Sequence, residues 1–399
     1  MIARGGSAWG LGVLQPVVDI PGVTDVLVNG GERGPGGGQR VWFDRGAGLE
    51  PVEVQIADEH ELRALAVRLA AAAGRRLDEG LPWVDARLPG GVRMHATVPP
   101  VTPSGTHLSL RLLGAARLDL AGLTAAGSVP PAWVPVLTAL VLRQAAFLVT
   151  GGTGAGKTTL LSALLGLVPA GERIALVEDV GELRPAHPHV IRLEARHANV
   201  EGRGAVTLDD LVRQALRMRP DRIVVGECRG PEVRELLSAL NTGHAGGCGT
   251  LHANAAAEVP ARLEALGSLA GLDRTAVHSQ ASAALDAVVH VQRGRDGRRV
   301  TEIGVFRGAS TAPTRHGTIP GAFAPVPGLC VLPALVADDD PRHPGHRGLG
   351  WPHLAQRLGL PSDDGPAARR NGEDPTGSRT AAPGASAPRT GPHPAGAAR

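Results

Sequence analysis

A glycine-rich segment from Gly151 to Thr158 carries the clearest chemistry in the sequence. It fits the pattern G-x-x-x-x-G-K-[ST], in which glycines let backbone N–H groups turn inward around a phosphate. An apolar run precedes the segment and a leucine-rich run follows it, so we expect a strand, a loop and a helix whose positive N-terminus faces the same anion. The predicted phosphate-binding residues are Gly151, Gly152, Thr153, Gly154, Ala155, Gly156, Lys157, Thr158 and Thr159.

Lys157 is the only lysine of the chain, and every other member of its 41 Lys and Arg residues is arginine. A compact ammonium on a flexible stem suits a point contact with phosphate, so its placement favours a functional loop over a simple strand-to-helix turn. Lys157 is expected to reach the β- and γ-phosphates, and the Thr158 hydroxyl is expected to be a ligand of Mg²⁺. The loop alone predicts only that a nucleotide phosphate binds.

Two acidic segments are candidates for the remaining chemistry of a nucleotide hydrolase. The first runs from Glu178 to Glu182 after a predicted strand at 174–177, and the second is Glu227 after a predicted strand at 223–225. The carboxyl ends of strands in an open α/β sheet share one edge, so both segments should face Lys157. Carboxylates of this kind hold Mg²⁺ and orient water during hydrolysis. Either segment alone would also be consistent with ordinary surface acids.

A third segment contains His244, Cys248 and His252. A histidine near a strand end can hydrogen-bond phosphate or water, so sensing of the γ-phosphate is the preferred interpretation. A metal site is the alternative, but the spacing of the three residues matches no standard zinc pattern. Each histidine taken alone would also be consistent with a structural role.

The predicted elements divide the chain into an N-terminal α+β domain and a larger α/β domain. The first, residues 1–115, has one predicted helix from Asp58 to Gly74 and predicted strands near 26–28, 41–43, 83–88, 92–98 and 108–112. A Gly- and Pro-containing linker is predicted at 116–130. From 131 to 308 strands and helices alternate, as in a mostly parallel sheet, and the region ends in a predicted hairpin around Asp296-Gly297.

Residues 309–399 form a low-complexity tail that is predicted to be largely disordered. Two stretches within it, 329–336 and 351–360, are apolar enough to dock on the preceding domain.

Composition limits the classes of function. The net charge is +3 and aromatic residues make up 2% of the chain, which argues against broad nucleic-acid binding. The three cysteines form no C-x-x-C pair, which fits a reducing cytoplasm. No stretch resembles a transmembrane helix or a signal peptide, so membrane association is expected to be peripheral.

The segments taken together resemble the type II/IV secretion ATPases. Their order matches that family's Walker A, Asp box, atypical Walker B and His box, represented here by 151–158, 178–182, 218–230 and 242–252. The Walker B segment ends in Gly226-Glu227, where many P-loop proteins have Asp. In the N-terminal half, segments 10–14, 23–30 and 84–89 look like the tight-adherence (Flp-type) pilus branch of the family.

This resemblance implies a RecA-like P-loop NTPase domain, bound ATP and Mg²⁺, and a homohexameric ring at the cytoplasmic face of the membrane. It implies that Glu227 takes the Walker B role and binds Mg²⁺, that Glu182 orients water, and that His252 and His244 belong to the site. Arginines of the N-terminal domain would reach the phosphates, and the matching residues are Arg93 and Arg111, with Arg87 a weaker candidate. The partners implied are proteins of an inner-membrane secretion or pilus platform.

Two features depart from the family pattern. The chain begins almost at the Gly10-Leu11-Gly12 segment, so we expect it to lack the extra N-terminal helical region of some relatives. The tail after 309 matches no family segment.

The leading prediction is an ATP-hydrolysing motor that drives pilus assembly or protein secretion, without direct contact to nucleic acid. A conjugal DNA-transfer ATPase would use the same residues, and a nucleotide-gated, non-catalytic scaffold would use only the binding loop. A GTPase is disfavoured, because the usual Asn-Lys-x-Asp segment cannot exist when the only lysine is Lys157. A small-molecule kinase is less easily excluded, although the acidic and histidine segments favour hydrolysis.

Overall fold

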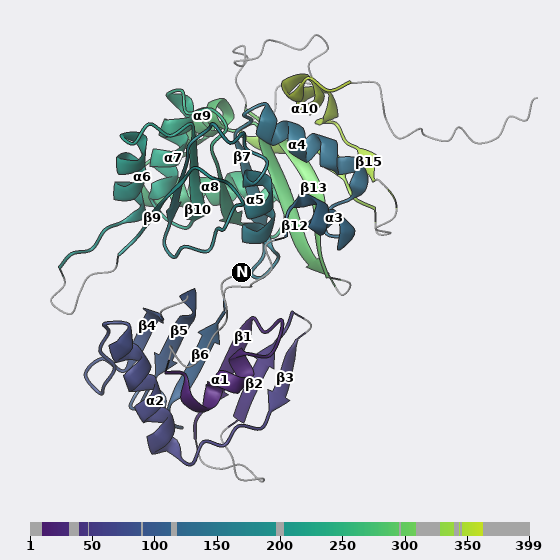
Figure 1. Ribbon diagram of the computed structural model, residues 1–399. Helices are drawn as coiled ribbons and strands as arrows, with labels where there is room; N and C mark the ends of the chain where they lie inside the picture. The colour runs from purple at the N-terminus through teal and green to yellow at the C-terminus, as the bar shows by residue number, and fades with distance from the viewer. Residues whose placement is uncertain are drawn as a thin grey trace, which may run out of the picture.

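The computed structural model describes residues 10–31, 40–46, 48–88, 91–112, 118–196, 203–294, 297–308, 328–338, 343 and 345–361. The described residues form two units, each built on its own sheet (Figure 1). Within them, no helix is both long and apolar enough to cross a membrane.

The N-terminal unit contains a six-stranded antiparallel sheet in the order β3-β2-β1-β6-β5-β4. Buried and more exposed positions alternate along its inner strands, as expected where one face of a sheet covers a core. The five strands predicted in this region are confirmed, and β3 is an addition. The strands are β1 (Asp25–Asn29), β2 (Arg40–Asp44), β3 (Leu49–Val52), β4 (Trp83–Arg87), β5 (Arg93–Thr97) and β6 (His107–Arg111).

Helix α2 (Glu59–Ala72) covers the buried face of this sheet together with a 3₁₀ turn, η1 (Gly12–Leu14), and the short helix α1 (Gln15–Val18). The Asp58 carboxylate accepts the backbone N–H of Glu61 (2.8 Å), and the Glu61 carboxylate accepts that of Ala57 (2.6 Å). This reciprocal pairing satisfies N–H groups that have no partner inside the helix, so the predicted helix start is confirmed.

The second unit contains a nine-stranded sheet in the order β15-β14-β13-β12-β7-β11-β10-β8-β9. The six strands from β12 to β9 in this order are parallel, and β13, β14 and β15 continue the sheet in antiparallel pairs. Strands β7 and β8 are buried along their whole length, as expected for parallel strands covered on both faces. Their bounds are β7 (Phe147–Gly151), β8 (Ile174–Glu178), β9 (Val190–Glu194), β10 (Arg222–Cys228), β11 (Cys248–His252), β12 (Ala287–Gly294), β13 (Gly297–Arg307), β14 (Cys330–Val336) and β15 (His346–Arg347).

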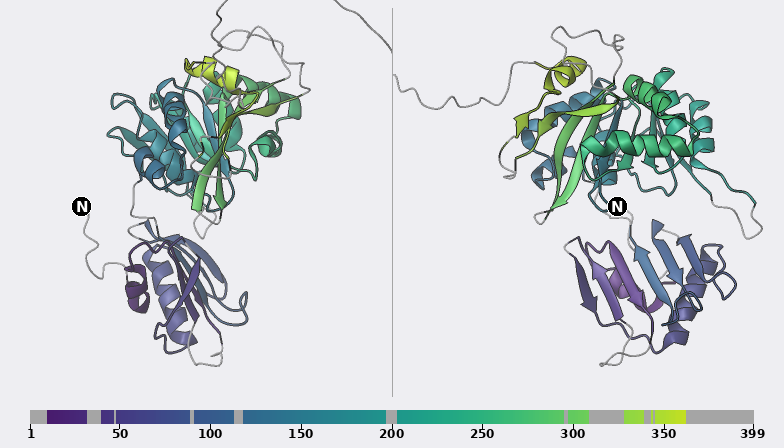
Figure 2. Two further views of the ribbon diagram at one scale, coloured as in Figure 1. Left: turned by 90° about the vertical axis from the view of Figure 1, so that its right-hand side faces the viewer. Right: turned by 180° about the vertical axis from the view of Figure 1, so that it is seen from behind.

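Helices pack on both faces of this sheet, and each face has its own apolar core. One face carries α3 (Leu120–Ala125), η3 (Pro131–Trp133), α4 (Val134–Leu142), α5 (Lys157–Leu165) and α10 (Trp351–Leu358). The other carries α6 (Leu208–Leu216), α7 (Glu232–Asn241), η4 (Ala256–Glu258), α8 (Val259–Leu269) and α9 (Arg274–Ala284). The two groups of helices lie on either side of the strands in Figures 1 and 2. This is the predicted α/β architecture.

The predicted linker at 116–130 is wrong in part, because it contains helix α3. The Asp119 carboxylate accepts the N–H of Gly122 (2.7 Å), which caps this helix. Leu120 and Leu123 are then buried in the core of the second unit. The scattered glycines in this segment suggested an irregular linker. A capping residue and two leucines are nevertheless enough to form a helix, because the leucines can pack against the apolar core of the second unit.

The second unit also extends beyond the predicted boundary at 308. Strand β14 pairs with β13, and α10 buries Trp351, Leu354 and Leu358 in the same core as α4. The Arg357 guanidinium adds an ion pair with Asp286 (2.8 Å). The predicted docking of 329–336 and 351–360 is therefore confirmed. Tail residues 309–327, 339–342, 344 and 362–399 and the turn at 295–296 lie outside the described residues.

Candidate active site

The glycine-rich loop lies between β7 and α5, as the sequence predicts. Gly151, Gly154 and Gly156 have φ values of +152°, +70° and +99°, which side chains rarely tolerate. A methyl group at Gly151 would also lie 2.2 Å from the carbonyl oxygen of Val291 on the neighbouring strand. The glycines are therefore needed for the loop to turn from the sheet edge into the helix.

Lys157 is the first residue of α5, and only 7% of it is exposed. Its Nζ donates to the carbonyl oxygens of Gly151 (3.0 Å) and Gly152 (2.9 Å). Burial lowers the pKa of this ammonium, whereas the nearby carboxylates of Glu227 and Glu182 oppose that shift. The His252 ring lies beside the same ammonium, so a phosphate at the N-terminus of the helix would compete with these contacts for the donors of Lys157.

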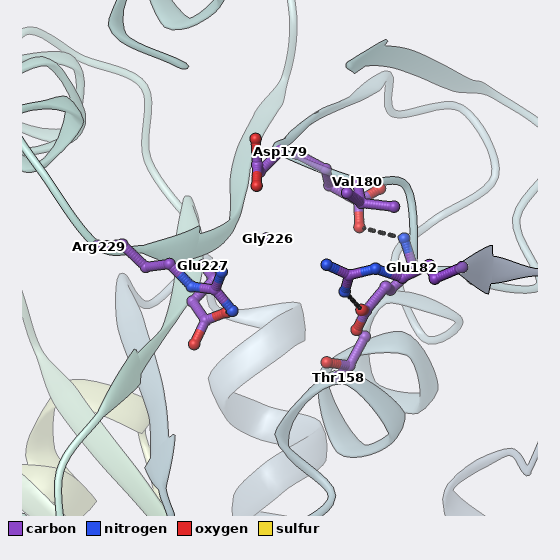
Figure 3. A pocket seen from close by; sticks show the side chains of 9 residues that line it. Thr158, Asp179, Val180, Glu182, Gly226, Glu227 and Arg229 are labelled. Atoms are coloured by element: carbon purple, nitrogen blue, oxygen red, sulfur yellow. Dashed lines mark hydrogen bonds and ion pairs between the residues drawn. The ribbon is translucent and has the colours of Figure 1, made fainter. Parts of the chain in front are cut away.

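Both predicted acidic segments meet beside this helix. Glu182 follows β8 and Glu227 lies near the end of β10, and both line one pocket with Thr158. Figure 3 shows their oxygen atoms around a common space. Hydroxyl and carboxylate oxygens are the ligands that Mg²⁺ prefers, so Thr158 and Glu227 fit a magnesium site. The pocket is lined by Arg93, Thr158, Glu178, Asp179, Val180, Glu182, Gly226, Glu227 and Arg229.

Glu227 is surrounded by cations and a histidine. It forms an ion pair with Arg229, and its Oε1 lies 2.5 Å from Nε2 of His252. The His252 ring lies 3.4 Å from Nζ of Lys157. Burial, and then the Lys157 ammonium, lower the pKa of His252 below its ordinary value, whereas the charge of Glu227 opposes this shift.

Two arginines of the β4–β5 hairpin connect the N-terminal unit to the first acidic segment. Arg93 donates to Oε1 of Glu182 (2.6 Å). Arg87 donates to the carbonyl oxygen of Gly181 (3.1 Å) and forms an ion pair with Glu194. The N-terminal unit therefore contributes a charge directly to the pocket.

Arg111, the other arginine predicted to reach the phosphates, is not among the residues that line this pocket. It lies directly opposite Arg93 in the β5–β6 register, one strand further from the sheet edge. There its Nε donates to Asp25 (3.0 Å) on the next strand. Sequence reasoning could not separate the two arginines, because only the strand order decides which of them lies nearer the second unit.

His244 is also separated from the phosphate loop. Strand β11 runs parallel to β7, so Cys248 pairs with Phe147 and His252 with Gly151. His244 precedes this strand, so it lies near the amino-terminal ends of the parallel strands, whereas the loop lies at their carboxyl ends. The zinc alternative receives no support, because no group of three or more His, Cys, Asp or Glu side chains that could hold a metal ion is found among the described residues.

Two residues at the site were not predicted individually. Arg229 comes two positions after Glu227, so its proximity was available as a signal. Arg298 of β13 donates through Nε to the carbonyl oxygen of Gly154 (2.8 Å). Nothing in the local sequence around Arg298 indicates this contact, which depends on the pairing of β12 with β7 and β13.

Known proteins share both the sequence and the fold. Residues 23–296 match the family model described as type II/IV secretion system protein. The chain is 56% identical to a Mycobacterium tuberculosis protein named "Putative conjugal transfer protein", over 75% of this chain and 85% of that one. It is 37% identical to the type IV secretion system protein PtlH of Bordetella pertussis, over 62% and 77%. The pilus retraction motor PilT has the same fold, with a TM-score of 0.53 at 23% identity over 74% and 82%.

Proposed function

Because the chain belongs to the type II/IV secretion system protein family, we propose that it is an ATP-hydrolysing motor that powers pilus assembly or protein secretion across the cytoplasmic membrane. One observation carries the hydrolytic part of this proposal. Thr158, which follows Lys157 in the phosphate loop, lines one pocket with the carboxylates of Glu182 and Glu227 and with Arg93 of the other unit. This set provides for binding, water activation and charge neutralisation in one place.

In the proposed reaction, the phosphate loop binds the β- and γ-phosphates of ATP through its backbone N–H groups and Lys157. Mg²⁺, held by Thr158 and Glu227, would neutralise phosphate charge when bound. Glu182 orients a water molecule and accepts its proton. The water oxygen bonds to the γ-phosphorus as the bond to the β–γ bridging oxygen breaks, which gives ADP and phosphate.

Arg93 has two successive partners in this proposal. One partner is Glu182, whose Oε1 accepts from Arg93 at 2.6 Å. With ATP bound, the γ-phosphate offers a stronger acceptor, and the guanidinium fork would turn from the carboxylate toward the phosphate oxygens. His252, between Lys157 and Glu227, would then report the state of the γ-phosphate to the Walker B strand. Occupancy of the site would thus be linked to the position of the N-terminal unit.

We further propose that the protein works as a homohexamer at the cytoplasmic face of the membrane, in peripheral contact with an inner-membrane platform. The family membership and the use of side chains from both units at one pocket support this arrangement. Within a ring, each site would respond to movements of neighbouring subunits.

Conjugal DNA transfer is the second candidate function. It is favoured by the 56% identity to a protein named for conjugal transfer. Such a motor would use the same pocket and need not contact DNA itself. Salt-sensitive binding of duplex or single-stranded DNA by the purified protein would favour this candidate over the pilus or secretion motor.

Two substitutions test the proposed chemistry. Lys157→Ala removes a phosphate contact and is expected to abolish both ATP binding and turnover. Glu227→Gln keeps the shape of the pocket but removes a charge, so turnover should fall by about 100-fold or more while ATP binding is retained. Phosphate release and binding of a fluorescent ATP analogue measure the two properties separately.

Glu235→Gln is a matched control, because it makes the same chemical change on α7, where Glu235 pairs with Arg213 outside the pocket. Its turnover should equal that of the wild type. Full activity of Lys157→Ala or Glu227→Gln would refute the catalytic assignment. A wild-type protein that binds ATP without turning it over would instead support the nucleotide-gated scaffold.

A further inference from the structure

A buried carboxylate, that of Glu178, lies in the wall between the two acidic segments and takes no part in the proposed reaction. Glu178 ends strand β8, and its side chain is 3% exposed. Its Oε1 accepts the backbone N–H groups of Glu182 and Leu183, both at 2.8 Å. One oxygen atom of Glu178 therefore accepts two hydrogen bonds from the turn that contains Glu182.

The same side chain contacts the strand that carries Glu227. A methyl group at Gly226 would lie 2.7 Å from Cγ of Glu178 and 3.2 Å from its Oε1. Glu178 can occupy this place only because residue 226 has no side chain. Since Gly226 immediately precedes Glu227, Glu178 sets how closely the end of β10 approaches the turn after β8.

The second carboxylate oxygen gains little stabilisation. Oε2 of Glu178 is buried without a hydrogen bond, and Nη1 of Arg192 lies 4.0 Å away. Burial raises the pKa of Glu178 above its ordinary value. A buried acid with an unused acceptor costs free energy, so this residue is a poor choice if stability alone were at stake.

We propose that Glu178 is a positioning residue that holds Glu182 and Glu227 at their working separation. The proposal rests on the proposed function, in which these two carboxylates serve water and Mg²⁺. One oxygen of Glu178 sets the turn of Glu182, and its Cγ sets the approach of Gly226. The phosphate loop follows a different strand, β7, so nucleotide binding does not depend on these contacts.

Three variants test this role by separating kcat from KM. Glu178→Ala leaves two amides without an acceptor, and kcat should fall by about 100-fold, the loss expected when a reacting group is misplaced by about 1 Å. KM for ATP should change by less than about threefold, because the phosphate loop is intact. Glu178→Gln retains an acceptor oxygen and should keep kcat within about threefold of the wild type. Gly226→Ala places a methyl group too close to the Glu178 side chain. It should also lower kcat and leave KM for ATP nearly unchanged.

The two contacts should also be coupled. If Glu178 and Gly226 act through one contact, the double variant should lose much less than the product of the two single losses. Asp286→Ala is the control for a purely structural role, since Asp286 accepts the N–H of Ala146 (2.8 Å) at the other edge of the same sheet. It should lower the melting temperature and leave kcat and KM unchanged.

Amide hydrogen exchange provides a readout that needs no activity. Glu178→Ala should speed exchange in both 179–183 and 226–227, and leave the loop at 151–158 unchanged. Three results for Glu178→Ala would each overturn the proposal. The first is an equal loss of kcat and of ATP binding, the second is unchanged exchange at 179–183, and the third is a wild-type kcat. A wild-type protein without ATP turnover would refute the proposed function, while the exchange result would still decide whether Glu178 holds the two segments.

Discussion

At the scale of single residues, the pocket is a set of oppositely charged side chains in contact with one another. Glu182 is paired with Arg93, and Glu227 is paired with Arg229 and lies beside His252. Each carboxylate therefore has a cationic side chain in contact with it. Binding of a polyanionic ligand would compete for the same cations.

Substitution of Arg93 tests this competition. Arg93→Ala should lower kcat by on the order of 1,000-fold, the contribution of an arginine that stabilises transition-state charge in phosphoryl transfer. Arg93→Lys should recover part of the loss, because it keeps the charge without the fork. Arg111→Ala is the matched comparison from the neighbouring strand, and its turnover should stay close to that of the wild type. The opposite ranking of Arg93 and Arg111 would show that the working state uses a different position of the N-terminal unit.

A buried histidine predicts how stability depends on pH. His290 on β12 is 1% exposed and shares a hydrogen bond with the Thr150 hydroxyl (2.9 Å). Burial lowers its pKa, the Lys157 ammonium acts in the same direction, and an amide contact at Asn254 and the charge of Glu258 oppose them. Below about pH 6.5 this histidine is therefore protonated more readily in the unfolded chain than in the folded protein. The free energy of unfolding falls as the pH falls.

Denaturant unfolding between pH 8 and 5 measures this effect. The contribution of His290 to the slope is at most about 1.4 kcal/mol per pH unit, which is the value for one proton. His290→Gln should remove that contribution, so the wild type and the variant should differ most above pH 6.5 and converge at lower pH. Parallel curves for the two proteins would contradict the assignment.

At the scale of elements, the β12–β13 hairpin is a second support of the phosphate loop. Arg298 donates to the carbonyl oxygen of Gly154, and its Cδ lies 3.1 Å from where a methyl group at Gly156 would be. Arg293 of the same hairpin donates to the carbonyl oxygen of Gly46 in the N-terminal unit (3.1 Å). The hairpin therefore contacts both the loop and the other unit.

Substitution of Arg298 should affect nucleotide binding more than chemistry. Arg298→Ala removes a charged donor from the loop, and KM for ATP should rise by about tenfold, as expected for a hydrogen bond worth about 1.5 kcal/mol. Arg299→Ala is the matched control, because the next residue donates to the carbonyl oxygen of Asp338 (2.7 Å) on the other side. Equal KM values for these two variants would mean that the contact with Gly154 does not support ATP binding.

At the scale of the whole molecule, two units with separate sheets contribute side chains to one pocket. Each has its own apolar core, and polar contacts from Arg87, Arg93 and Arg293 connect them. A polar interface of this kind permits relative movement of the units when a ligand changes the charges between them. That movement is what a motor would transmit to neighbouring subunits.

The proposed ring is open to direct observation. Particle imaging of the purified protein should show six-fold rings, with more of them in the presence of ATP because bound nucleotide links the units. Glu227→Gln with ATP should enrich the same state, since it binds without rapid turnover. A persistent monomer under all of these conditions would contradict the proposed assembly.

The sequence by itself determined the local elements and most of the pocket. Glycine spacing predicted the phosphate loop, apolar runs predicted β7, β8, β10 and β11, and acids directly after β8 and near the end of β10 predicted Glu182 and Glu227. The strands and the two carboxylates lie where the sequence predicts, because these inferences depend on neighbours along the chain and on the rule that parallel strands end at a common side of the sheet.

Tertiary structure decided what sequence neighbours cannot encode. Only strand order separates Arg93 from Arg111, and only strand direction removes His244 from the edge that holds His252. Helix α3 and strand β14 lie in stretches whose sequences do not clearly predict a helix or a strand. They are stabilised because α3 packs on the apolar core of the second unit and β14 pairs with β13. The contacts of Glu178 with Gly226 and of Arg298 with Gly154 join segments 48 and 144 residues apart in sequence, and such distances are set by the packed sheet alone.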